Sequence, residues 1–79
     1  MQVSVELPSM GDDADGEAIV SYWLVEDGDM VPEGADLVEL TTDKASFSVP
    51  CPRRGRLIEK TVEEGDSVCV GDVLCVLET

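Results

Sequence analysis

Short runs of Val and Leu alternate with turn residues along the whole chain, and no long stretch has the residue spacing of an amphipathic helix. The runs are bounded by Gly, Pro and Asp, and several alternate between apolar and polar positions as half-buried strands do. Two of the turns, residues 26–29 (EDGD) and 63–66 (EEGD), contain a Gly that can adopt positive φ. The pattern predicts an all-β fold.

The chain also repeats itself. Residues 25–42 and 62–79 align at an offset of 37, with nine of eighteen positions identical. A second similarity precedes each half, where residues 4–8 (SVELP) resemble residues 46–50 (SFSVP). Each half is too small to bury an apolar face alone, so the two halves must pack together. We therefore expect a flattened barrel or sandwich with a quasi two-fold axis, whose halves join near residues 43–45.

The join between the halves is predicted to be a β-hairpin with Asp43 and Lys44 at its tip. Pairing the flanking strands around this tip places apolar pairs on one face and polar pairs on the other (Leu40/Phe47 and Val38/Val49; Glu39/Ser48 and Thr41/Ser46). A slip of one residue would destroy this separation. The tip lacks the Asn-Gly type of sequence that two-residue turns favour, so turn chemistry does not explain a Lys there.

The repeat also predicts where the tip lies. The quasi two-fold axis relates the strands beside Lys44 to the first and last strands of the chain, so both termini should lie at the opposite end. A domain held by either terminus would present Lys44 outward, as a carrier must. Lys44 is one of only two lysines.

Length, charge and the lack of His exclude several classes of function. A chain of 79 residues is one domain, residues 1–79, with little room for a catalytic cleft. The 18 acidic and 5 basic residues give a net charge of −13, which argues against nucleic acid and anionic membranes as partners. No apolar stretch is long enough to span a membrane. The chain has no His, which disfavours hydrolase triads and most metal sites. We expect a monomeric, non-catalytic domain.

The three cysteines do not suggest a disulfide framework, because their number is odd and they lack a Cys-x-x-Cys spacing. A reducing compartment fits better, the bacterial cytoplasm in preference to the mitochondrial matrix. Cys69 and Cys75 lie in apolar runs and are expected to be small core residues. Trp23 and Phe47 are expected in the core as well, with a half-exposed Trp23 as the alternative.

Residues 42–46 (TDKAS), followed by Val-Pro at 49–50, resemble the attachment motif of lipoyl domains in the acyltransferase (E2) component of 2-oxo acid dehydrogenase complexes. Residues 7–11, 25–31 and 65–71 resemble other parts of the same domain, so the similarity covers nearly the whole chain. The resemblance implies a barrel-sandwich hybrid of two four-stranded antiparallel sheets. It also implies lipoic acid covalently attached to Lys44, with Asp43 and Ala45 as flanking recognition residues.

The resemblance implies a set of partners too. A lipoate ligase or lipoyl transferase would join lipoic acid to Lys44 through an amide. The decarboxylase E1 would then acylate the arm reductively, the E2 core would transfer the acyl group to coenzyme A, and dihydrolipoyl dehydrogenase, E3, would reoxidise the arm. In such a system the cofactor supplies the chemistry and the domain supplies position.

The sequence departs from this family at two places. Thr41 stands where the family often has an acidic residue, and the stretch between Gly11 and Gly28 is about a residue longer and more acidic than usual. That stretch contains residues 12–15 (DDAD), which we interpret as a recognition loop because the spacing and final Glu of a calcium-binding EF-hand loop are absent. Ala45-Ser46 favours a pyruvate or branched-chain complex over a 2-oxoglutarate complex.

Other interpretations remain open. A biotin carrier has the same fold and lysine position, although its lysine is typically flanked by Met, and the glycine-cleavage H protein is usually longer. The chain could also be an unmodified structural or binding module of the same fold. Residues 53–56 (RRGR) hold three of the five basic residues and could be a docking patch or a solvated turn.

Overall fold

The computed structural model describes residues 1–8 and 17–79, and within these ranges every regular element is a β-strand. No helix in the described part of the chain is long and apolar enough to cross a membrane. The eight strands are β1 (Gln2–Glu6), β2 (Glu17–Trp23), β3 (Met30–Val31), β4 (Asp36–Thr41), β5 (Ser46–Pro50), β6 (Gly55–Lys60), β7 (Ser67–Cys69) and β8 (Val73–Glu78).

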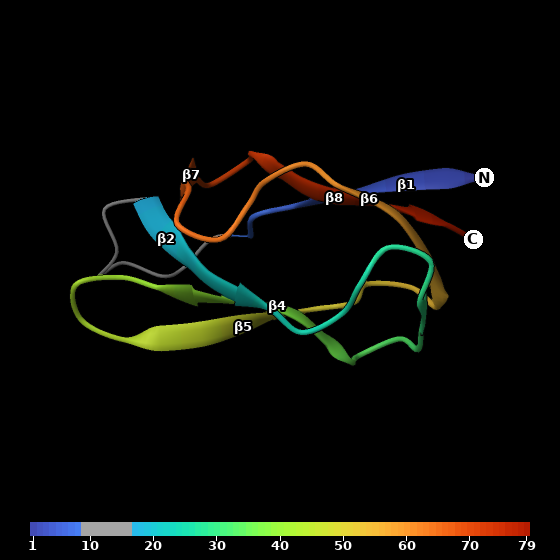
Figure 1. The fold of residues 1–79 in the computed structure, drawn as a ribbon, viewed down its shortest axis with the longest axis horizontal. Coiled ribbons are helices and arrows are strands. Elements are labelled where there is room, and N and C mark those ends of the chain that lie inside the picture. Colours follow the sequence, from blue (N-terminus) through green and yellow to red (C-terminus); the bar gives the residue numbers. More distant parts are fainter. Residues whose placement is uncertain (9–16) are drawn as a thin grey trace.

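The strands form two four-stranded antiparallel sheets, in the orders β1-β8-β6-β3 and β5-β4-β2-β7 (Figure 1). Each sheet takes two strands from each half of the sequence, so neither half could form a sheet alone. The predicted all-β fold with two antiparallel sheets is confirmed. The sheets face each other as a sandwich, and among the described strands no ladder joins them into a closed barrel.

The strand register confirms the quasi two-fold axis, which relates each residue of the first half to the residue 37 positions later. Val20 pairs with Leu40 between β2 and β4, and the equivalent Leu57 pairs with Leu77 between β6 and β8. The turns obey the same symmetry, because Gly28 and Gly65 have φ of 92° and 94°. These backbone angles are strained for any side chain with a Cβ, which explains why both positions are Gly.

The second predicted repeat was wrong in its register by two residues. Val5 pairs with Cys75, and Val49 pairs with Val38, the residue equivalent to Cys75. Residues 2–6 therefore correspond to residues 46–50, an offset of 44. A shift of two residues keeps every side chain on the same face of a strand, so alternation alone could not reveal the error.

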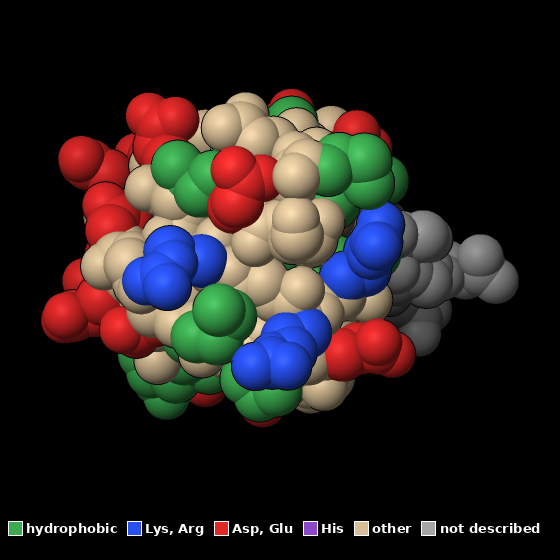
Figure 2. Space-filling model, turned by 90° about the vertical axis from the view of Figure 1, so that its right-hand side faces the viewer, with side chains coloured by type: hydrophobic (Ala, Val, Ile, Leu, Met, Phe, Trp, Pro, Cys, Tyr) green, Lys and Arg blue, Asp and Glu red, His purple; other side chains and the backbone are tan. Residues whose placement is uncertain are grey.

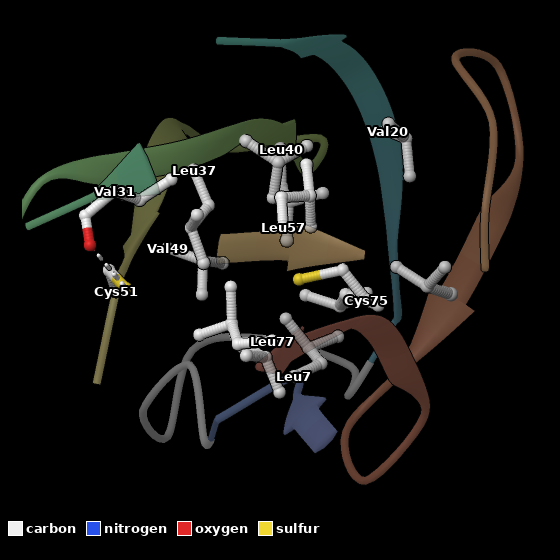
Figure 3. Close-up of a cluster of buried hydrophobic side chains, with 14 of the residues drawn as sticks. Leu7, Val20, Val31, Leu37, Leu40, Val49, Cys51, Leu57, Cys75 and Leu77 are labelled. Carbon is white, nitrogen blue, oxygen red and sulfur yellow. Dashed lines mark hydrogen bonds between the residues drawn. The ribbon is translucent and has the colours of Figure 1, made fainter. Parts of the chain in front are cut away.

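The core lies between the two sheets and consists of 15 buried apolar residues, most of which are drawn in Figure 3. Leucines of both sheets, such as Leu40 from β4 and Leu77 from β8, point into this interior. Nearly every core position has its symmetry-related counterpart in the core. The core residues are Val5, Leu7, Ala18, Val20, Val31, Leu37, Val38, Leu40, Val49, Cys51, Leu57, Val68, Leu74, Cys75 and Leu77.

Three predictions about large or sulfur-containing residues have different outcomes. Cys75 is fully buried, as predicted. Cys69 is exposed, so its assignment to the core was wrong: in β7 its neighbour Val68 points inward, and strand alternation turns Cys69 outward. Trp23 and Phe47 are partly buried and pack against the core, so the half-exposed alternative is confirmed for Trp23 and the placement of Phe47 within the core was wrong.

Candidate functional site

The β4–β5 hairpin carries Asp43 and Lys44 at its tip in the predicted register. Leu40 pairs with Phe47 and Thr41 pairs with Ser46, so the apolar and polar faces are separated as the sequence indicated. The hairpin is firmly held because β4 lies inside its sheet, between β5 and β2. Residues 42–45 extend beyond the paired strands, with Asp43 and Lys44 at the tip.

The tip lies at the opposite end of the molecule from both termini (Figure 1). The termini lie together, because the Met1 ammonium donates to the Thr79 carbonyl at 3.0 Å and forms an ion pair with Glu78 at 2.9 Å. The longest dimension of the described domain is 33 Å. Attachment through either terminus would therefore leave Lys44 facing away from the attachment point.

Side chains at the tip are open to solvent. Asp43, Lys44 and Ala45 are all exposed, and no carboxylate in the described part of the chain lies within 4.0 Å of the Lys44 ammonium. The Lys44 Nζ is therefore accessible to an enzyme that approaches the end of the hairpin. Because of the family motif, Asp43 and Ala45 remain the predicted flanking recognition residues, and both are exposed to such an enzyme.

The hairpin backbone is closed by Thr42. Its N–H donates to the Ala45 carbonyl at 2.8 Å, while its Oγ1 accepts from the N–H groups of Lys44 and Ala45, both at 3.2 Å. A regular two-residue turn would instead use the Thr42 carbonyl to accept from Ala45. The sequence analysis did not identify this role of Thr42. The one signal in the sequence is that Thr42 is identical to Thr79, its equivalent in the repeat.

An open hollow of about 440 Å³ lies beside the tip. It is lined by residues from β2 and from the end of β4: Glu17, Ala18, Ile19, Thr41, Thr42 and Asp43. Its walls offer carboxylates and hydroxyls but no His or Cys, so it provides neither a strong nucleophile nor a base tuned to neutral pH. Within the described residues, no group of three or more His, Cys, Asp or Glu side chains could hold a metal ion.

The remaining perturbed groups do not form a reactive centre. Burial raises the pKa of Cys75 to about 12, and burial also raises the pKa of Cys51. A thiol reacts as its thiolate, so both groups are inert at neutral pH. The negative charge of the nearby Glu39 is the largest cause that raises the pKa of Tyr22.

The Arg cluster predicted as a docking patch or a turn lies far from Lys44. Arg53 and Arg54 belong to the turn before β6, and Arg56 pairs with Glu78 beside the C-terminus. Figure 2 shows basic side chains on this end of the molecule. The acidic recognition loop predicted at residues 12–15 lies outside the described residues. The same holds for much of the stretch between Gly11 and Gly28, which is longer and more acidic than is usual in the family.

The fold and the tip together define a class of protein: a small β-sandwich that presents one lysine on a hairpin, with its termini at the far end. Residues 3–79 match the model of the Biotin_lipoyl family, described as "Biotin-requiring enzyme". The chain belongs to this family. Domains of this kind are non-catalytic carriers.

Curated relatives agree with this assignment. The chain is 36% identical over 98% of its length to the dihydrolipoyllysine-residue acetyltransferase component of the pyruvate dehydrogenase complex of Corynebacterium glutamicum, of which it covers 11%. It is 36% identical over 92% of its length to the lipoamide acyltransferase component of the branched-chain alpha-keto acid dehydrogenase complex of Bacillus subtilis, covering 17%. The chain thus spans only a small part of these relatives.

Solved structures show the same fold. The lipoyl domain of the 2-oxoglutarate dehydrogenase complex from Azotobacter vinelandii superposes with a TM-score of 0.75 at 25% identity, covering 98% of this chain and 96% of that one. A single-chain, multi-domain long-chain acyl-CoA carboxylase also matches, with a TM-score of 0.73 at 24% identity over 95% of this chain and 7% of that one. The second match supports the fold alone.

Proposed function

We propose that Lys44 carries a lipoyl group and that the domain moves this group between the active sites of a 2-oxo acid dehydrogenase complex. The observation that carries the proposal is the position of Lys44: exposed, at the tip of a hairpin, and at the opposite end from both termini. The curated relatives support lipoyl as the group, because their names are those of dihydrolipoyllysine-residue and lipoamide acyltransferases.

In this proposal the protein's own part is attachment and presentation. The deprotonated Lys44 amine attacks an activated lipoyl carboxyl, an amide bond forms, and the activating group leaves while the nitrogen loses a proton. The attached dithiolane then supplies acyl transfer and redox chemistry. Tethering confines the arm near E1, the E2 core and E3, which raises its effective concentration at each active site.

The test is intact mass after incubation with a lipoate ligase, ATP and lipoic acid. The unsubstituted domain should gain one lipoyl group, and Lys44→Arg should gain none. Lys60→Arg is the matched control, because it removes the only other lysine and should leave modification complete. No gain by the folded, unsubstituted domain would contradict the proposal.

Biotin is the second candidate group, because the family description names biotin and a carboxylase domain shares the fold. The same three proteins should therefore be incubated with a biotin ligase, ATP and biotin. We expect little or no biotinylation, since Asp43 and Ala45 flank the lysine where biotin carriers typically have Met. Efficient biotinylation of Lys44, with no lipoylation, would replace lipoyl by biotin in the proposal.

We further propose a pyruvate dehydrogenase complex as the host, on the basis of Ala45-Ser46 and the Corynebacterium relative. Other relatives belong to branched-chain and 2-oxoglutarate complexes, so the choice needs its own assay. The lipoylated domain should be offered to each type of E1 with its labelled 2-oxo acid. The E1 that acylates the domain with the highest kcat/KM identifies the complex, and light scattering of the same sample checks the expected monomer.

A further inference from the structure

The hydroxyl of Thr42 uses its full hydrogen-bonding capacity at the hairpin tip. It accepts from the N–H groups of Lys44 and Ala45, both at 3.2 Å, and it donates to the Ala45 carbonyl, also at 3.2 Å. A hydroxyl has one proton to donate and two lone pairs to accept with, so no capacity is left for solvent. The side chain of Thr42 is half-buried, while the tip residues that it binds are exposed.

The backbone conformation of the tip explains why the hydrogen bonds of the Thr42 hydroxyl are needed. Two-residue hairpin turns of the common kinds require positive φ at one or both central positions. Among the described residues only glycines have positive φ, and neither Asp43 nor Lys44 is a glycine. The side chain of Thr42 therefore binds the Ala45 N–H, which the Thr42 carbonyl would bind in a regular turn.

The second half of the chain provides a comparison within the same molecule. Thr79 is equivalent to Thr42, and Met1 is equivalent to Ala45. The Thr79 N–H donates to the Met1 carbonyl at 2.8 Å and its Oγ1 contacts the same carbonyl at 3.2 Å, as Thr42 does with Ala45. Thr42 differs from Thr79 in binding the N–H groups of the tip, one of which belongs to Lys44 itself.

We propose that Thr42 is a positioning residue for the modification of Lys44. The proposal rests on the proposed lipoylation. The hydroxyl fixes the backbone of the acceptor lysine, so the ligase meets an ordered tip. Ordering the tip during binding or attack would cost conformational entropy and slow the bond-forming step.

Ligation kinetics test the proposal in the intact domain. Thr42→Val, which has a similar shape but no hydroxyl, should lower kcat/KM for the ligase by about tenfold, as expected from the loss of exposed hydrogen bonds. Thr42→Ser keeps the hydroxyl and should restore most of the rate. Thr79→Val loses the equivalent bond at the far end and should be modified at the unsubstituted rate. If Thr42→Val does not fold, Thr42→Ala must show the same loss of rate.

A second readout does not depend on the ligase. Amide hydrogen exchange at Lys44 and Ala45 should be faster in Thr42→Val than in the unsubstituted domain, and unchanged in Thr79→Val. Equal exchange and equal kcat/KM in Thr42→Val and the unsubstituted domain would overturn the positioning role while leaving lipoylation intact. Failure of the unsubstituted domain to be modified would overturn lipoylation, and the positioning role with it.

Discussion

Trp23 and Lys60 occupy equivalent positions in the two halves and contact each other across the quasi two-fold axis. The Lys60 ammonium lies 5.5 Å from the centre of the Trp23 ring. Trp23 Nε1 donates to the Val62 carbonyl at 3.1 Å, and Lys60 Nζ donates to the carbonyl of the equivalent Val25 at 3.4 Å. Two chemically different side chains thus make equivalent hydrogen bonds, and their difference in charge adds a cation–π contact that two identical residues could not make.

This pair predicts a measurable coupling energy. Lys60→Met keeps the aliphatic stem but removes the charge, and Trp23→Leu removes the ring. Unfolding by urea, followed by circular dichroism, should show a coupling of about 0.5–1 kcal/mol between them in a double-mutant cycle. Trp23→Leu alone should cost about 2–3 kcal/mol, because it also loses packing and the bond to Val62. Additive effects would show that the ring and the ammonium do not stabilise each other.

Gly55 gives a second prediction about the same symmetry. Its equivalent is Ala18, which is buried and pairs with Val68, while Gly55 pairs with Val31. A Cβ on Gly55 would lie 2.8 Å from the Glu78 carbonyl oxygen and 3.1 Å from Thr79 Cγ2. The first contact is with backbone, so the β6–β8 pairing would have to shift.

Gly55→Ala should therefore lower the free energy of unfolding by about 2 kcal/mol, in the range of overpacked cores. Gly34→Ala is an informative comparison, since its Cβ would meet nothing within 4 Å and its cost would come from φ of 88° alone. Urea denaturation of both variants checks the prediction. If the Gly55→Ala domain is as stable as the unsubstituted one, the ends of β6 and β8 can shift to accommodate the added Cβ at little cost in free energy.

Much of the fold could be predicted because the alternation of apolar and polar residues fixes which face of a strand is buried. That rule located the hairpin register around Lys44 correctly. It could not detect a two-residue shift in the N-terminal repeat, because such a shift leaves the faces unchanged. The core assignment of Cys69 was wrong because an apolar run does not show which of its residues face inward, whereas alternation with the buried Val68 turns Cys69 outward.

Only part of the candidate site could be predicted from the sequence. Lys44 could be located, because pairing and symmetry specify where a hairpin tip lies. The role of the Thr42 hydroxyl depends on the direction of one side-chain bond and on the φ angles of two tip residues. Neither quantity is specified by residue spacing, so only the three-dimensional structure reveals that Thr42 closes the turn.

Exposure and pKa together predict how the three cysteines react. Cys69 is exposed, whereas Cys51 and Cys75 are buried and burial raises the pKa of each. With a chromogenic disulfide reagent at pH 8, one thiol should react rapidly and two should react only as fast as the domain opens. Cys69→Ser should abolish the fast phase. Rapid reaction of two or three thiols in the folded domain would contradict this description of the core.

The pKa of Cys75 also predicts how stability depends on pH. Its value rises from 9.0, which applies to the exposed thiol of the unfolded chain, to about 12 in the folded domain, mainly through burial. Below pH 9 both states keep the proton, so the thiol adds no pH dependence. Between pH 9 and about 12 the unfolded chain loses the proton while the folded domain retains it, so unfolding becomes easier as the pH rises. Urea midpoints should therefore fall with pH across this window.

The matched control for this prediction is Cys75→Ala, which creates a small cavity but has no thiol to titrate. Its stability should be lower than that of the unsubstituted domain at pH 8, and its further decline between pH 9 and 11 should be shallower. All other ionisable groups are the same in both proteins, so only the difference between the two slopes reports on Cys75. Parallel slopes would mean that Cys75 ionises as readily in the folded domain as in the unfolded chain, and that the interior beside it admits water.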